Sequence, residues 1–239
     1  MKATNACSVQ FLFLNDMQKT ALIIGATGLV GELCLNELLN SVAYGKVIAL
    51  SRTKIISRKA KLVNIVTDFE NLESIKEQLK ADDVFCAIGT TITKAGSKEA
   101  FRKVDYEIPL KVAELTRKNG AKKFILISSI GADASSAVFY SKVKGELEEA
   151  LKKLRFDWLI IFRPSILLGD RKEKRTGEAI GRFAVEKLSF LFAGPLKKYK
   201  GTPVYLLGRL MVKMAQEILP SSLEKLPLVR IIGNEEILK

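Results

Sequence analysis

The chain has 239 residues and no histidine, and its 39 lysines and arginines against 26 acidic residues give a formal charge of +13. The lack of histidine excludes a Ser-His-Asp triad, a Cys-His pair and every histidine-ligated metal site, and we expect no metal. Three widely spaced cysteines, Cys7, Cys34 and Cys86, are typical of a reducing compartment, so we predict a cytoplasmic protein.

Much of the excess positive charge lies late in the chain, at 152–153, 171–175 and 197–200. No aromatic platform or zinc-finger pattern accompanies it, so the sequence favours a solvated basic face over a nucleic-acid site. The same charge favours a ligand that carries phosphate. We expect no membrane span, and we interpret residues 1–17 as an N-terminal extension rather than a signal peptide.

The first motif is Gly-Ala-Thr-Gly-Leu-Val-Gly at 25–31, between an apolar strand at 21–24 and an amphipathic helix. Gly25 permits a tight turn, Gly28 lets the backbone approach a pyrophosphate, and Gly31 lets the helix pack closely on the strand. The helix N-terminus favours phosphate charge. A glycine-rich structural turn is the alternative. We expect the dinucleotide to contact Gly25, Thr27, Gly28, Leu29, Val30 and Gly31.

Strand and helix patterns alternate through the rest of the chain. Further strands are expected at 46–51, 62–67, 83–87, 123–128, 157–162 and, at one edge, 229–232. Helices are expected at 72–79, 98–118, 140–154, 178–191 and 205–218. This alternation predicts an α/β fold, doubly wound around a mostly parallel sheet. We predict one Rossmann domain at 18–239, with a small C-terminal annex for substrate at about 170–203.

The end of the second strand bears on the choice of cofactor. An enzyme that uses NAD usually carries an acidic residue there to bind the ribose diol. Here the strand ends in Ser51-Arg52, with Lys54 beyond and no carboxylate. The guanidinium of Arg52 can pair with a 2′-phosphate, and the Ser51 hydroxyl can add a hydrogen bond. The residues therefore predict NADP(H), against the alternative of an exposed arginine without a ligand.

A second motif, Tyr140-Ser141-Lys142-Val143-Lys144, follows the strand that ends at Ser128-Ser129. Tyr140 and Lys144 share one helix face, because positions four apart are neighbours on a helix. A nearby ammonium and an oxidised nicotinamide stabilise a phenolate and lower its pKa, which suits tyrosine to acid–base work. By itself the pattern also fits an ordinary surface helix.

Together these motifs resemble the short-chain dehydrogenase/reductase superfamily over residues 19 to about 169. Within it, the chain is most similar to the atypical branch of HIV Tat-interacting-protein-like, NAD(P)H-binding proteins. The residues that carry the resemblance are Gly-Ala-Thr-Gly-Leu-Val-Gly at 25–31, Ile-Ser-Ser-Ile-Gly-Ala-Asp at 127–133, Tyr140 and Lys144, and Arg-Pro-Ser-Ile-Leu-Leu-Gly at 163–169.

The resemblance implies a Rossmann fold with the cofactor across the C-terminal edge of the sheet. It gives Tyr140 the acid–base role and Lys144 the role of gripping the ribose. It places Ser129 at the position of the catalytic serine, with Ser128 beside it as the alternative. The family's helix asparagine is matched by Asp105 here, which leaves the proton relay open.

Further cofactor contacts follow from the resemblance and from the strand ends. Asp68-Phe69 resembles the family's adenine-side contact, and Pro164 falls where related chains pass the nicotinamide. The residues expected along the ribose and pyrophosphate follow the fourth strand: Ala87, Ile88, Gly89 and Thr90.

The function implied is that of an NADPH-dependent oxidoreductase acting on a small carbonyl-like substrate, with Tyr140 as proton donor. The first alternative is a non-catalytic NADP(H)-binding redox sensor that acts through a protein partner. The second is a nucleotide-sugar epimerase, for which the annex is small. Substrate identity and oligomeric state stay open.

Overall fold

The computed structural model describes residues 18–169, 199–217 and 227–239. The predicted extension at 1–17, the helix at 178–191 and most of the annex at 170–203 lie outside these residues. The described part contains seven strands in one sheet and a separate two-stranded pair.

The sheet has the strand order β3-β2-β1-β4-β5-β6-β9, and neighbouring strands are parallel throughout. The strands are β1 (Lys19–Ile24), β2 (Tyr44–Ser51), β3 (Leu62–Val66), β4 (Asp83–Cys86), β5 (Lys123–Ile127), β6 (Trp158–Arg163) and β9 (Leu228–Gly233). The pair outside it joins β7 (Leu167–Leu168) to β8 (Thr202–Pro203). The predicted α/β doubly wound fold is confirmed.

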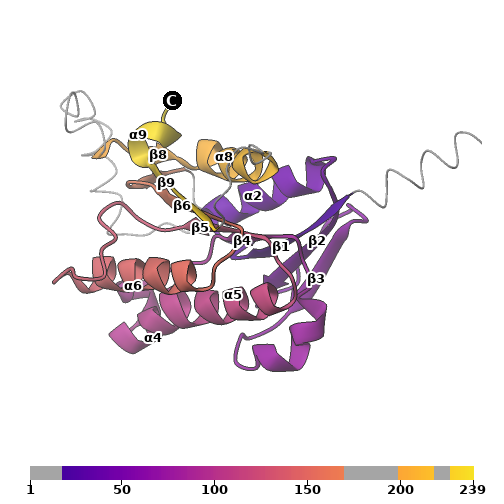
Figure 1. The fold of residues 1–239 in the computed structure, drawn as a ribbon, viewed down its shortest axis with the longest axis horizontal. Helices are drawn as coiled ribbons and strands as arrows, with labels where there is room; N and C mark the ends of the chain where they lie inside the picture. Colours follow the sequence, from indigo (N-terminus) through magenta and orange to yellow (C-terminus); the bar gives the residue numbers. More distant parts are fainter. Residues whose placement is uncertain (1–17, 170–198, 218–226) are drawn as a thin grey trace, which may run out of the picture.

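Helices cover both faces of the sheet (Figure 1). The helical segments are α2 (Leu29–Asn40), η1 (Leu72–Gln78), α3 (Ile92–Ala95), α4 (Lys98–Arg102), η2 (Lys103–Glu107), α5 (Ile108–Lys118), α6 (Phe139–Lys153), α8 (Val204–Gln216) and α9 (Asn234–Ile237). The α2 and α8 helices bury one apolar cluster, and α5 and α6 bury another on the opposite face. Burial on both faces explains why the central strands are apolar throughout.

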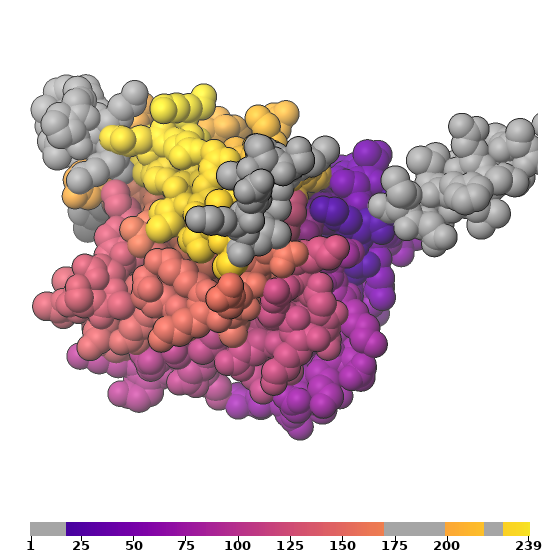
Figure 2. All heavy atoms as spheres, viewed as in Figure 1, coloured from indigo at the N-terminus to yellow at the C-terminus, as the bar shows by residue number. Residues whose placement is uncertain are grey.

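The C-terminal strand completes one edge of the sheet. β9 pairs with β6 along its whole length, from Leu228 beside Trp158 to Gly233 beside Arg163. The space-filling view shows this segment in yellow, above the helical layer that contains α6 (Figure 2). The predicted edge strand is therefore present and is two residues longer than expected.

The helix expected at 98–118 is interrupted. It is divided into α4, a π turn at η2 and α5. Pro109 lies just after the turn and has no N–H to donate to the carbonyl of Asp105, so regular α-helical bonding fails there. The helix expected at 72–79 is a 3₁₀ helix instead.

The sheet order creates a crevice at the carboxyl ends of β1 and β4. After β1 the chain moves outward to β2 and β3, and it then returns to β4 on the other side of β1. Ligands of open parallel sheets bind where the strand order reverses in this way. The loops that follow β1 and β4 therefore define the place to look for a site.

The close packing of α2 against the turn after β1 depends on Gly31. A Cβ at Gly31 would overlap the carbonyl of Gly25, whereas a Cβ at Gly233 would meet no atom within 4 Å. Gly31→Ala should destabilise the protein by about 1–3 kcal/mol, which lowers the Tm by roughly 2–12 °C for a chain of this size. Thermal unfolding checks this result with Gly233→Ala as the near-neutral control. Equal Tm values for the two variants would contradict it.

Candidate functional site

The glycine turn after β1 lies directly against the backbone of the loop after β4. Gly25 has a φ of 83°, in the left-handed region, and a Cβ there would overlap the backbone of Ala87 and Ile88. The N–H of Gly28 donates to the carbonyl of Gly25 at 2.9 Å. Gly28 also caps α2 without a side chain, so the first N–H groups of the helix face outward and can bind an anion.

A cavity of about 440 Å³ runs along this edge of the sheet and collects most of the predicted cofactor residues. Those that line it are Gly25, Thr27, Gly28, Ser51, Arg52, Asp68, Phe69, Ala87, Ile88, Gly89 and Thr90. Val30 and Gly31 are buried behind the turn. Leu29, Lys144 and Pro164 are not among its lining residues.

Ser51 and Arg52, the two cofactor contacts predicted at the end of β2, have different surroundings. Ser51 is buried; its hydroxyl donates to the carbonyl of Thr53 at 2.7 Å and accepts from the amide of Asn64 at 2.8 Å. That hydroxyl proton is already in use, so Ser51 shapes the turn. Arg52 is exposed and lines the cavity, so it is the group available to a 2′-phosphate.

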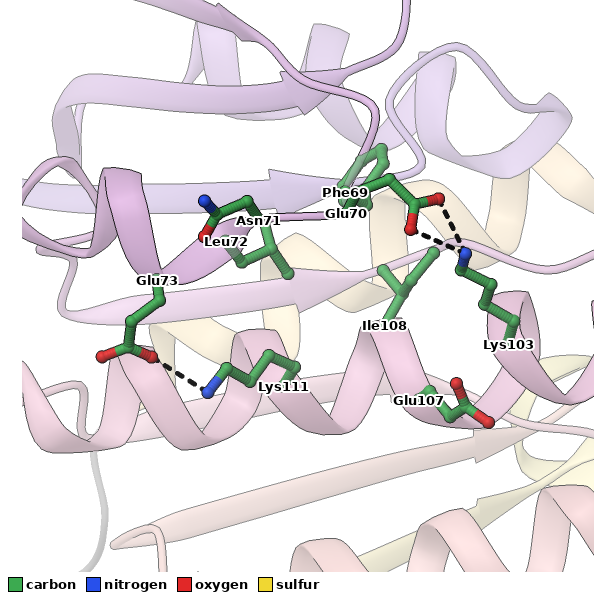
Figure 3. A pocket seen from close by; sticks show the side chains of 9 residues that line it. All are labelled: Phe69, Glu70, Asn71, Leu72, Glu73, Lys103, Glu107, Ile108 and Lys111. Carbon is green, nitrogen blue, oxygen red and sulfur yellow. Dashed lines mark hydrogen bonds and ion pairs between the residues drawn. The ribbon is translucent and has the colours of Figure 1, made fainter.

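Phe69, which also lines the cavity, has a strained backbone. Its φ is 70°, which is uncommon for a bulky residue, and its N–H donates to the Thr67 hydroxyl at 3.1 Å. Phe69 also lines an adjoining hollow of about 370 Å³ (Figure 3). Lys103 and Glu70 line both spaces, and their ion pair at 2.7 Å spans from η2 to the loop after β3. The two residues lie 33 positions apart, so no local spacing predicts the pair.

Tyr140 and Lys144 share the inner face of α6. The Tyr140 ring packs against Phe101 of α4, with ring centres 5.5 Å apart. Lys144 is buried, and its Nζ lies 2.7 Å from Oδ1 of Asp105. Burial works to lower the pKa of Lys144, but the charges of Asp105 and Tyr140 outweigh it and raise the pKa above its ordinary 10.5. Lys144 is therefore an ammonium at neutral pH.

The two adjacent serines are held differently. Ser128 is buried and donates to the carboxylate of Glu148 at 2.5 Å. Ser129 is only half-buried, and its hydroxyl makes a 3.2 Å hydrogen bond to the neighbouring carbonyl of Ile130. The Ile130 N–H donates to the carbonyl of Pro164 at 2.9 Å, which joins the ends of β5 and β6. Ser129 is thus the less constrained hydroxyl of the two.

Glu148 connects three elements around these serines. Besides Ser128, it accepts from Nε of Arg163 at 3.1 Å and from Nη2 at 2.5 Å. Its side chain is 1% exposed, whereas that of Arg163 is 30% exposed. The Glu148 hydrogen bonds are the main cause that raises the pKa of Arg163. The pair was not predicted, because its residues lie 15 positions apart on different elements, although Glu148 continues the four-residue spacing of Tyr140 and Lys144.

The described residues contain no cluster of three or more His, Cys, Asp or Glu side chains that could hold a metal. No helix among them is long and apolar enough to cross a membrane. The cleft is lined by the glycine turn before α2 and by the exposed Arg52, and the Lys144 ammonium of the Tyr140 helix face lies close to its lining residue Gly89. Such a constellation can bind a dinucleotide and transfer a proton beside it.

The fold and this cleft define a dinucleotide-binding α/β protein. A family model described as NAD(P)H-binding matches residues 25–187, and the chain belongs to this family. It is 42% identical to rat HTATIP2 over 168 residues, 69% of each chain. It is 37% identical to FMP52 of Candida albicans over 227 residues, 91% of this chain and 96% of that one. The predicted family resemblance is confirmed.

The comparison of solved structures bears on the fold alone. MoeE5 in complex with UDP-glucose and NAD superposes with a TM-score of 0.65 at 18% sequence identity. The match covers 90% of this chain and 76% of MoeE5. At this identity the agreement supports the Rossmann architecture.

The predicted cytoplasmic location is corrected by the relatives. FMP52 proteins of several fungi are named as mitochondrial, so membership of this family conflicts with a purely cytoplasmic assignment. The error has a simple cause. Widely spaced cysteines indicate a reducing environment, and that condition does not distinguish one intracellular compartment from another.

Glu148 and its neighbour Glu149 provide a matched pair of variants. Glu148→Ala leaves the buried Ser128 hydroxyl and the Arg163 guanidinium without their acceptor, which should cost on the order of 3 kcal/mol of unfolding free energy. Glu149 pairs with Lys152 at 2.7 Å and is 54% exposed, so Glu149→Ala should cost less than about 1 kcal/mol. Urea unfolding measures the unfolding free energy of both variants, and similar losses of stability would contradict this prediction.

Proposed function

We propose that the protein is an NADPH-dependent oxidoreductase that reduces a carbonyl group on a small molecule. The observation that carries the proposal is the position of Lys144: its Nζ would lie 3.7 Å from a Cβ on Gly89, a residue that lines the cleft. The ammonium that supports Tyr140 is therefore next to the loop expected to carry the cofactor ribose.

The residues fit the cofactor. Backbone N–H groups at the start of α2 would bind the pyrophosphate, and Arg52 would bind the 2′-phosphate. When bound, the reduced nicotinamide supplies a hydride to the carbonyl carbon. Tyr140 donates its phenolic proton to the carbonyl oxygen, which becomes the alcohol. Ser129 orients that oxygen, and Lys144 stabilises the phenolate left on Tyr140.

Cofactor preference is tested by calorimetric titration with NADPH and NADH. Charged hydrogen bonds to the 2′-phosphate contribute roughly 1.5–3 kcal/mol, so NADPH should bind about 10- to 150-fold more tightly. Arg52→Asp should abolish or reverse the preference. Arg58→Asp is the control, because Arg58 is an exposed cation of the same loop that does not line the cleft. Equal affinities in the wild type would refute the NADP assignment.

Catalysis is tested by NADPH oxidation over a panel of carbonyl compounds. Tyr140→Phe should reduce turnover by at least ~100-fold while NADPH affinity stays within a few-fold, because the hydroxyl faces substrate. Lys144→Met should reduce both turnover and NADPH affinity. Tyr205→Phe is the control, since Tyr205 is an exposed residue of α8.

The same panel decides between the enzyme and the redox sensor. Tight NADPH binding without oxidation of NADPH by any carbonyl compound favours the sensor. In that case NADP(H) should change the affinity for a protein partner recovered by pull-down, and Tyr140→Phe should leave the change intact. The epimerase alternative predicts interconversion of nucleotide sugars without net consumption of NADPH.

A further inference from the structure

Asp105 is fully buried at the centre of the π turn, between two elements of the cleft. Its Oδ2 accepts from the backbone N–H of Thr90 at 2.9 Å, and its Oδ1 lies 2.7 Å from Nζ of Lys144. Among the described residues, Oδ1 accepts no hydrogen bond from any other group. One carboxylate therefore joins the loop after β4 to the helix α6.

This ion pair lies directly behind the cleft. A Cβ on Gly89 would be 3.4 Å from Oδ1 of Asp105 and 3.7 Å from Nζ of Lys144. Gly89 itself lines the cleft, so the paired charges lie within van der Waals distance of a side-chain position on a cleft-lining residue. A ligand that lies over Gly89 is within reach of the ammonium.

Both partners of Asp105 are donors, and this explains why a carboxylate is needed. An asparagine has one acceptor oxygen and one NH₂ group, so in either orientation its NH₂ would face the Thr90 N–H or the Lys144 ammonium. A buried ammonium also needs a counter-ion to stay charged. A carboxylate meets both requirements, and an amide of the same shape meets neither completely.

We propose that Asp105 is a positioning residue for the cofactor: its carboxylate fixes Lys144 and the Gly89–Thr90 backbone in one arrangement before the cofactor binds. The inference rests on the proposed function, because it assigns the ribose side of the same cofactor. A lysine on a flexible stem that is already oriented loses less conformational freedom on binding, and preorganisation of this kind increases affinity.

The first test is a thermal unfolding cycle that needs neither substrate nor cofactor. Asp105→Asn and Lys144→Met should each lower the Tm, since each leaves a buried group without its partner. In the Lys144→Met background, Asp105→Asn should no longer lower the Tm, because the carboxylate is then the uncompensated charge. An equal loss in both backgrounds would show that Asp105 acts only through Thr90, and would overturn the proposal.

The second test is NADPH affinity as a function of pH. The groups that face Lys144 are Asp105 from η2, Tyr140 from α6 and Cys86 from β4. Burial raises the pKa of the Cys86 thiol to about 12, so it stays neutral. Wild-type affinity should be constant between about pH 7.5 and about 9.5, because a paired Lys144 stays protonated there.

Asp105→Asn should weaken NADPH binding by about 10-fold or more at the lower pH. The loss should grow as the pH rises, because a buried lysine without its counter-ion gives up its proton. Glu107→Gln removes an exposed carboxylate from the same turn and is the matched control. If Asp105→Asn binds NADPH like the wild type at every pH, the positioning role is wrong and the proposed function survives. If the wild type itself does not bind NADPH, both are wrong.

Discussion

The close contact between the turn after β1 and the loop after β4 is the constraint on which the site depends. The left-handed Gly25 lies against the backbone of Ala87 and Ile88, and Gly31 brings α2 against the carbonyl of Gly25. Side chains at these positions would separate β1, β4 and α2. The same two contacts also direct the N–H groups at the start of α2 into the crevice where the strand order reverses.

Buried charges beneath the cleft occur in pairs that connect different elements. Lys144 of α6 is balanced by Asp105 of the π turn, and Glu148 of α6 is balanced by Arg163 at the end of β6. Both pairs start from the helix face that carries Tyr140. A buried charge is tolerated when its partner and its hydrogen bonds replace the lost contacts with water. Removal of one partner leaves the other charge buried without compensation, which strongly destabilises the fold. The two pairs therefore hold α6 in register with β4, β5 and β6.

Features of the site that depend on neighbouring residues could be predicted from sequence, whereas long-range pairs could not. The glycine turn and the Tyr140/Lys144 face follow from spacing along one element. The Asp105–Lys144 and Glu148–Arg163 pairs join residues far apart in the chain, and only the folded arrangement selects them. The hydrogen bond from Asn64 to the predicted contact Ser51 also depends on the fold, because β3 lies beside β2. The π turn was missed because helix periodicity does not report a local change of pitch.

The distribution of charge differs between the two ends of the cleft. At the outer end of the cleft, Arg52 is exposed and can meet a phosphate with its full charge. At the inner end, the charge of Lys144 is offset by Asp105. The field that Lys144 projects toward the cleft is therefore weaker than that of a lone ammonium. An anionic ligand group is therefore attracted more strongly at the Arg52 end of the cleft than at the Lys144 end.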